Sequence, residues 1–246
     1  GVQSFKLADP DKFDVENFNR QESATFDTVG QNKAQVIADA ILDINPWAQV
    51  EVFQEGVQPE NLEKFLAGST LIADEANYEE HQIGVGIARA AREAGVRVMS
   101  AINFAFGAQV TTFKPEGVTL EEYLGLDPDM SLAEIAGQPV RPEKWIAWLP
   151  PYLDTKTFPA IQSGKISDPS ISVGVSAAST LATTEALKII MDDKRFGKPV
   201  YAPQVAVFDA MTGKMSTVKH PDFSRARSAV ALILRNRFGR APQIDL

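Results

Sequence analysis

Two acidic residues directly follow short apolar runs, at the places where a doubly wound sheet binds its ligands. Asp9 follows the run at 4–8, and Asp74 follows the run at 70–73. In a nucleotide-binding sheet, an acid at the carboxyl end of the second strand hydrogen-bonds the ribose hydroxyls. Asp9 fits that role, although an acid in this position can equally cap a turn. The residue types therefore indicate nucleotide binding and leave a structural role for Asp9 open.

A glycine-rich phosphate loop normally lies about 20 residues before such an acid. Only eight residues precede Asp9, and the 246 residues contain no G-x-G-x-x-G run. Gly84-Val85-Gly86 is the nearest approximation, but it lies within a helical pattern. We therefore expect the first strand, the glycine loop and the first helix to lie upstream of Gly1.

The segment at 9–21 places acids, amides and an arginine at fixed intervals. It reads D-P-D-K-F-D-V-E-N-F-N-R-Q, and V-G-Q-N-K-A follows at 29–34, with Lys33 thirteen residues after Arg20. This pattern resembles the D-x-D-x-V-x-x-x-N-x-N-R-Q and v-G-x-x-K-a stretches of the ThiF/MoeB/HesA family, the bacterial relatives of ubiquitin-activating enzymes.

Shorter matches to the same family follow in order along the chain. They are N-P at 45–46, E-A-L-K at 185–188 and F-D-A-M-T-G at 208–213. The resemblance therefore runs from about residue 4 to residue 220. Residues 114–170 and the C-terminal residues match the family much less well.

The resemblance implies a definite reaction. Members of the family activate a carboxylate, which attacks the α-phosphate of ATP bound with Mg²⁺ and yields an acyl-adenylate and pyrophosphate. The carboxylate is the C-terminus of a ubiquitin-like protein or belongs to a small molecule. Such a reaction requires cations that are in place before the phosphate charge develops.

The resemblance also assigns roles to individual residues. Arg20 and Lys33 occupy the family's phosphate-binding, catalytic positions, where Arg clamps two phosphate oxygens and Lys supplies a mobile point charge. Either cation alone would be interpreted as a solvated surface charge, but their combined spacing favours phosphate binding. The remaining ATP-binding positions in this stretch are the ribose acid, a second acid and two neutral donors: Asp9, Asp11, Asn17 and Gln21.

The magnesium position departs from the family pattern. The family's magnesium-associated aspartate falls 44 residues after the lysine, where this chain has Asn77. An amide offers one neutral oxygen, which is a weaker ligand for a hard cation than a carboxylate. We expect Asn77 to remain part of the ATP site and Asp74 to be the magnesium ligand and a third catalytic residue. Glu75 and Glu79 are less favoured substitutes, and a structural role for Asp74 stays open.

The chain contains no cysteine. It therefore has neither the nucleophile for the thioester of ubiquitin-activating enzymes nor the paired C-x-x-C zinc site of many relatives. We expect the activity to end at adenylation, with no zinc, and the adenylate to pass to another nucleophile. The resemblance further implies a homodimer whose active sites are completed across the subunit interface.

Alternating strand and helix patterns predict an α/β fold that is Rossmann-like and doubly wound, with a mostly parallel sheet and helices on both faces. Apolar runs predict strands at 4–8, 50–53, 70–73, 96–101 and 109–113. Apolar residues at three- and four-residue steps predict helices at 33–44 and 79–94, and a long helix is predicted at 171–191. An antiparallel hairpin is predicted at 205–218. The expected organisation is a nucleotide-binding domain at 1–220, a crossover insertion within it at 114–170 and a helical extension at 221–246.

Two histidines and two tryptophans are the other residues considered for a role in the chemistry. His81, on a helix face turned away from the apolar stripe, and His220, before a proline, are expected at the surface. Trp145 and Trp148 are expected in a core or a subunit contact, and a substrate groove is the alternative.

Bulk composition narrows the function classes. The net charge of −8 argues against nucleic-acid binding. The longest weakly polar stretch, 171–190, carries too many polar residues to cross a membrane, and no signal peptide is visible, so a cytoplasmic protein is expected. Two other functions stay open: a non-catalytic nucleotide-binding or scaffold member of the family, and an NAD-dependent oxidoreductase. The latter accounts for Asp9 but not for the motif at 17–33.

Overall fold

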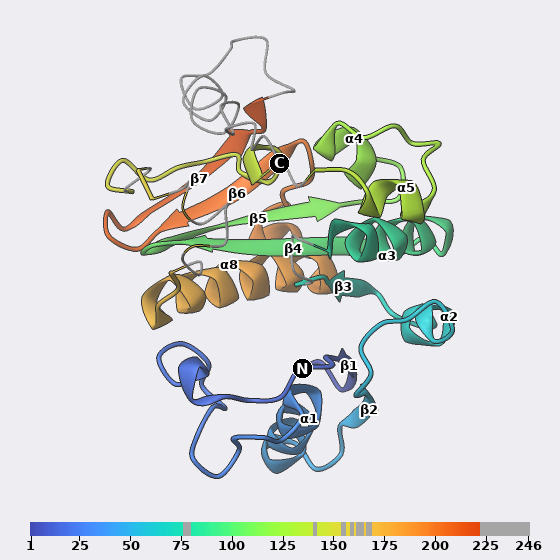
Figure 1. The fold of residues 1–246 in the computed structure, drawn as a ribbon, viewed down its shortest axis with the longest axis vertical. Helices are drawn as coiled ribbons and strands as arrows, with labels where there is room; N and C mark the ends of the chain where they lie inside the picture. The colour runs from blue at the N-terminus through green and yellow to red at the C-terminus, as the bar shows by residue number, and fades with distance from the viewer. Residues whose placement is uncertain are drawn as a thin grey trace. The chain divides into compact units, whose positions relative to one another are not determined.

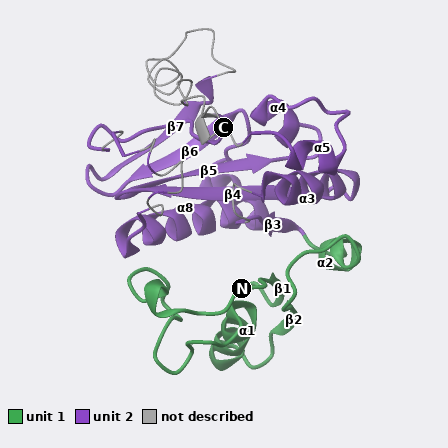
Figure 2. Ribbon diagram, viewed as in Figure 1, with its two compact units in different colours: residues 1–69 green, residues 70–246 purple. Residues whose placement is uncertain are grey.

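The computed structural model describes residues 1–75, 80–139, 142–153, 156–157, 160, 165 and 169–221. The chain forms two compact units, residues 1–69 and 70–246, and each has its own sheet (Figures 1 and 2). Each unit also has its own hydrophobic core. The C-terminal helix expected after residue 221 lies outside the described residues. The expected extent of the nucleotide-binding domain, 1–220, stays a prediction.

The first unit is built on one parallel strand pair. β1 (Ser4–Ala8) pairs with β2 (Gln49–Phe53), and the register from Ser4↔Gln49 to Ala8↔Phe53 puts both carboxyl ends at the same edge. Parallel strands need a crossover connection, which is supplied here by α1 (Lys33–Ile44). The short helices η1 (Val15–Asn17) and α2 (Leu62–Leu66) complete the unit. These strands and α1 confirm the predicted elements.

The second unit contains one sheet with the strand order β3-β4-β5-β6-β7. Its described strands are β3 (Leu71–Ala73), β4 (Arg97–Phe104), β5 (Gly107–Phe113), β6 (Gln204–Asp209) and β7 (Lys214–Lys219). Only the pair β3–β4 is parallel, and the other three pairs are antiparallel. The expectation of a mostly parallel sheet is therefore wrong for these strands, whereas the α/β class and the C-terminal hairpin are confirmed.

The antiparallel pairing has a local cause. β4 ends at Phe104 and β5 begins at Gly107, so that Ala105 and Phe106 are the whole connection. A link this short can join only antiparallel strands. Ala105 adopts a positive φ of 49°, a conformation common in tight hairpin turns.

Helices cover both faces of the sheet in the second unit (Figure 1). On one face, α8 (Ser172–Met191) packs Leu181 and Ile189 against Met99 and Val110. On the other face lie α3 (His81–Glu93) and three short helices of the insertion: α4 (Leu120–Leu124), α5 (Leu132–Ala136) and α6 (Pro142–Trp145). Another short helix, η3 (Lys194–Phe196), follows α8. Helices on both faces were predicted, and the structure confirms them.

Both histidines are buried, which corrects the prediction that they lie at the surface. His81 is 6% exposed and donates from Nε2 to the carbonyl of Ile135 at 2.8 Å, because α3 is covered by α5 as well as by the sheet. His220 is fully buried, donates to the Lys144 carbonyl at 3.0 Å and packs at a tilt against Tyr123, with the two ring centroids 4.3 Å apart. His81 therefore links the insertion to α3, and His220 links it to the end of β7.

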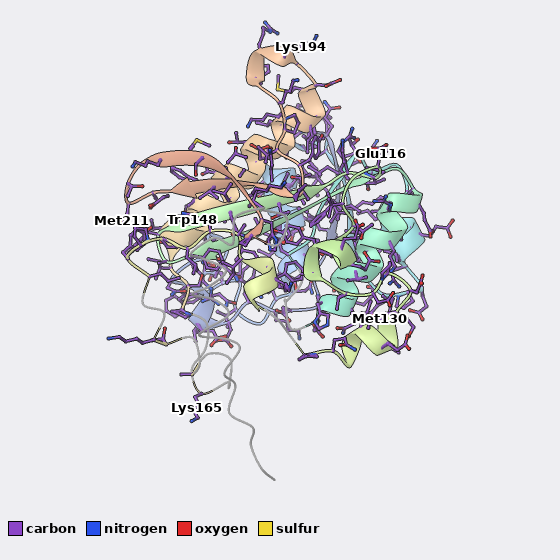
Figure 3. All side chains as sticks on the ribbon, turned by 90° about the horizontal axis from the view of Figure 1, so that it is seen from above. Glu116, Met130, Trp148, Lys165, Lys194 and Met211 are labelled. Atoms are coloured by element: carbon purple, nitrogen blue, oxygen red, sulfur yellow. The ribbon has the colours of Figure 1, made fainter. Side chains whose placement is uncertain are left out.

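Trp148 also packs inside the second unit. A Cβ added at Gly107 would come within 2.9 Å of the Trp148 ring, so the indole covers β5 where the strand has no side chain (Figure 3). Trp145 and Trp148 lie against the core of Val85, Tyr123 and Val207. The prediction of core packing is confirmed for these residues. Among the described residues, no helix is long and apolar enough to cross a membrane.

Candidate functional site

The loop that leaves β1 brings together three of the predicted site residues. Asp9 Oδ1 accepts a hydrogen bond from the backbone N–H of Asp11 at 2.8 Å. The carbonyl of Asp11 accepts from the backbone N–H of Lys33 at 2.9 Å, and Lys33 Nζ lies 3.0 Å from Asp11 Oδ2. Asp9, Asp11 and Lys33 therefore form one cluster at the carboxyl edge of the β1–β2 pair, where the sequence predicted a ribose and phosphate site.

Lys33 occupies a position that suits an anionic ligand. It is the first residue of the twelve-residue helix α1, and the N-terminal backbone N–H groups and dipole of a helix favour negative charge. Its side chain is 17% exposed, whereas that of its partner Asp11 is 68% exposed. An ion pair with such an open partner contributes at most about 1 kcal/mol. A phosphate group can therefore compete with Asp11 for the ammonium group.

Asn17, Arg20 and Gln21 form a second group in the same loop. Asn17 is 4% exposed, and its Oδ1 accepts from the Asp14 backbone N–H at 3.0 Å. The backbone N–H groups of Arg20 and Gln21 both donate to the Asn17 carbonyl. Arg20 Nη1 donates to the Glu16 carbonyl at 2.7 Å. The side-chain oxygen of Asn17 thus organises the loop, and that part of its role is structural.

The hydrophobic cluster of Phe13, Ala24 and Val36 fastens this loop to α1. The backbone of Phe13 reinforces it, since its N–H donates to Gln31 and its carbonyl accepts from Gly30. Gly30 has a φ of +83°, which glycine adopts without strain. The loop is consequently fixed at both ends relative to Lys33.

In the second unit, Asp74 lies at the end of β3 as predicted. Its backbone N–H donates to the Met99 carbonyl at 2.7 Å, which continues the β3–β4 pairing. Its carboxylate lies over the first turn of α3, because a Cβ added at Gly84 would come within 2.9 Å of Asp74 Oδ2. Gly84 thus leaves room for a carboxylate beside a helix N-terminus, where negative charge is favoured.

Glu75 is the neighbouring acid. Its Oε1 accepts from the Ala101 backbone N–H at 3.0 Å, so the carboxyl group turns onto β4 although the residue as a whole is exposed. The removal of this carboxyl from water raises its pKa to about 8, against an ordinary 4.5, and the Asp74 carboxylate adds to the rise. At neutral pH, the Glu75 carboxyl is therefore mostly protonated and acts as a neutral hydrogen-bonding group.

No group of three or more His, Asp or Glu side chains is placed to hold a metal ion within the described part of the chain. Asp74 as a magnesium ligand therefore stays a prediction. Asn77 and Glu79, which were considered for the same site, lie outside the described residues.

The later matches to the family pattern have structural roles. Glu185, 1% exposed, accepts from Lys188 Nζ at 2.6 Å and from the Val200 backbone N–H at 2.8 Å, which holds the chain after α8 against the helix. Asp209 accepts from Tyr152 at 2.7 Å and from Thr212 Oγ1 at 2.8 Å. Burial alone would raise the pKa of Asp209, but these hydrogen bonds lower it below its ordinary value.

One residue in contact with the cluster of Asp9, Asp11 and Lys33 was not singled out by sequence reasoning. Asn32, immediately before α1, bonds to the β1 loop and to the helix at the same time. The available signal was its place before the first residue of the predicted helix, which is typical of an N-cap.

The fold and the cluster define a class of α/β protein. Its members carry an acid, a lysine with a largely covered side chain and a helix N-terminus at the carboxyl edge of a parallel strand pair, here Asp9, Lys33 and the start of α1. The ThiF family profile matches residues 1–228, and the chain therefore belongs to the ThiF family.

Several curated proteins match over part of the chain. The tRNA threonylcarbamoyladenosine dehydratase of Escherichia coli is 39% identical over 67 residues, which are 27% of this chain and 25% of that protein. The probable molybdopterin-synthase adenylyltransferase of Porphyra purpurea is 29% identical over 48% of this chain and 30% of its own length. The SAMP-activating enzyme E1 of Haloferax volcanii is 27% identical over 48% of this chain and 43% of its own length. The matches thus span less than half of each of these relatives.

Solved structures share the fold. MccB of E. coli superposes with a TM-score of 0.62 at 14% identity, covering 89% of this chain and 56% of MccB. PaaA superposes with a TM-score of 0.59 at 18% identity, over 88% of this chain and 56% of PaaA. At these identities the likeness establishes the architecture alone.

Proposed function

We propose that this protein adenylates a carboxylate with ATP. A carboxylate oxygen attacks the α-phosphorus, the bond from that phosphorus to the bridging oxygen breaks, and pyrophosphate leaves with the acyl-adenylate formed. The observation that carries the proposal is the cluster of Asp9, Asp11 and Lys33 at the N-terminus of α1. The names of relatives support it, since a molybdopterin-synthase adenylyltransferase and a SAMP-activating enzyme are among them, and MccB has been crystallised with ATP.

Each residue has a chemical task in this proposal. Asp9 accepts hydrogen bonds from the ribose hydroxyls, and Lys33 exchanges Asp11 for a phosphate oxygen. Arg20 neutralises charge as pyrophosphate departs, a contribution that a cation makes only if it is already in place. Asp74 is proposed as the ligand of Mg²⁺. The other proposed ATP-binding positions are Asp11, Asn17, Gln21 and Asn77.

The substrate carboxylate is proposed to be the C-terminus of a ubiquitin-like protein or peptide, or a small molecule. In support, one relative is named a SAMP-activating enzyme, and MccB, which shares the fold, has been crystallised with MccA. Because the chain has no cysteine, we propose that the reaction ends at the adenylate. A homodimer and a cytoplasmic location complete the proposal.

ATP–pyrophosphate exchange in the full-length protein tests this function. The carboxylate substrate in the assay would be a ubiquitin-like protein that ends in Gly-Gly, and small carboxylic acids would be tested in parallel. Replacement of Lys33 or Arg20 by Ala should lower exchange at least a hundredfold, as the loss of one preorganised charge typically does. Lys64→Ala is the control, because the Lys64 side chain is 71% exposed in the same unit. Full exchange in the Arg20→Ala, Lys33→Ala double variant would refute the proposal, and ATP binding without exchange would favour a non-catalytic member of the family.

A further inference from the structure

Asn32 connects three parts of the first unit through one side chain. Its Nδ2 donates to the carbonyl of Asp9 at 2.7 Å and to that of Asp11 at 3.2 Å, with a longer contact of 3.4 Å to Gln54 after β2. Its Oδ1 accepts from the backbone N–H of Gln35 at 3.1 Å and so caps α1. The donor end of the amide thus holds the β1 loop, and the acceptor end holds the helix.

The two ends of the amide have separable consequences. The acceptor satisfies one of the free N–H groups in the first turn of α1, which any good N-cap residue does. The donor fixes the carbonyls of Asp9 and Asp11, the two acids of the nucleotide cluster. Because Lys33 is the next residue along the chain, the amide sets the distance between the ribose acid and the phosphate cation.

We infer that Asn32 is a positioning residue of the nucleotide site: it holds the turn at Asp9 and Asp11 in register with Lys33. The inference rests on the proposed function, since it concerns how the ATP site is preorganised. A carboxylate at this position would keep the helix cap and have no donor, and a serine hydroxyl would bring a single hydrogen on an arm one bond shorter, so an amide is the side chain that serves both tasks.

The test compares Asn32→Ser with Asn32→Ala in ATP and AMP titrations with Mg²⁺. Serine keeps an N-cap acceptor and alanine does not, but neither carries the amide NH2 group that reaches the backbone carbonyls of Asp9 and Asp11. We expect both variants to bind ATP about tenfold more weakly than the wild type, and the ratio of ATP to AMP affinity to fall. Only Asn32→Ala should lose the helix cap and melt at a clearly lower temperature than Asn32→Ser.

Asn45→Ser is the matched control, at the other end of α1, where Asn45 Oδ1 accepts from the Trp47 backbone N–H at 3.2 Å. It should bind both nucleotides like the wild type. ATP binding by Asn32→Ser within twofold of the wild type would overturn the inference, and so would a loss of affinity in Asn32→Ala alone. A wild-type protein that binds neither nucleotide would instead refute the proposed function and the inference with it.

Discussion

Lys33 combines a largely covered aliphatic stem with an ammonium group whose partner is open to solvent. The Lys33 side chain, at the start of α1, is 17% exposed, while that of Asp11 is 68% exposed. A hydrogen bond to a charged group contributes about 1.5–3 kcal/mol where water is excluded, more than an exposed ion pair. We therefore interpret the Asp11–Lys33 pair as the resting arrangement of a phosphate-binding lysine.

At the same scale, Gly84 tests the role of Asp74. Gly84→Ala would displace the Asp74 carboxylate, because the new Cβ would lie 2.9 Å from Oδ2. The helix should not suffer, since alanine is about 1 kcal/mol more favourable than glycine in a helix interior. If Asp74 binds Mg²⁺, the variant keeps its melting temperature while its magnesium requirement for exchange rises several-fold. Gly86→Ala, two residues along the same helix, is the control, and an unchanged magnesium requirement in Gly84→Ala would make Asp74 structural.

Glu75 predicts a pH dependence of stability. Its pKa in the folded protein, about 8, lies above the ordinary 4.5, so folding favours the protonated carboxyl. The stabilisation is therefore complete below about pH 4.5 and is lost as the pH rises towards about 8. Glu75→Gln should remove this dependence. Urea unfolding of the wild type and of Glu75→Gln at pH 5, 6.5 and 8 would check it. If the free energies of unfolding of the two proteins change equally with pH, the pKa of Glu75 is not raised.

At the scale of elements, Gln109 shows how the insertion is fastened to the sheet. The side chain, 1% exposed on β5, donates to the Trp145 carbonyl at 2.6 Å and accepts from the Ala147 backbone N–H at 3.0 Å. Gln109→Ala would leave both backbone groups buried without partners, which costs about 1–3 kcal/mol for each group. We expect a loss of about 3 kcal/mol in urea denaturation. Gln204→Ala, at the exposed start of β6, should change stability by less than about 0.5 kcal/mol, and a similar value for Gln109→Ala would show that the insertion does not depend on this amide.

The helices and strands of the described residues could be predicted because their signals are local. Helix α1 begins at Lys33, as the apolar spacing indicated, and the strand at 4–8 is reproduced. The direction of β5 could not be predicted, because the run from Ser100 to Val110 conceals a two-residue turn within apolar sequence. The burial of His81 and His220 was also missed, since it depends on partners 54 and 76 residues away in the chain.

At the scale of the whole molecule, the candidate site was predictable where it is continuous in sequence. The cluster of Asp9, Asp11 and Lys33 lies within 25 residues, and its motif has fixed spacing. Asn32 was missed because its importance comes from hydrogen bonds across 21 to 23 residues and not from its residue type. The two units, 1–69 and 70–246, each carry part of the family pattern. The ThiF assignment therefore rests on residues 1–228, which include parts of both units, whereas the cluster that carries the nucleotide-binding proposal lies in the first unit.

The most direct test of that proposal is a titration of AMP, ADP and ATP against the wild type, Lys33→Met and Asp9→Asn. Methionine keeps the covered stem of Lys33 without its charge, and asparagine keeps the acceptor for the Asp11 N–H. We predict that Lys33→Met leaves AMP affinity unchanged and weakens ATP about 10- to 100-fold, as the loss of a charged hydrogen bond to a phosphate implies. Asp9→Asn should weaken all three nucleotides by one common factor. No loss of affinity for either nucleotide in Lys33→Met would contradict the assignment of Lys33 to the phosphates. Equal losses for AMP and ATP would contradict a contact between Lys33 and the β- or γ-phosphate, because AMP carries only the α-phosphate.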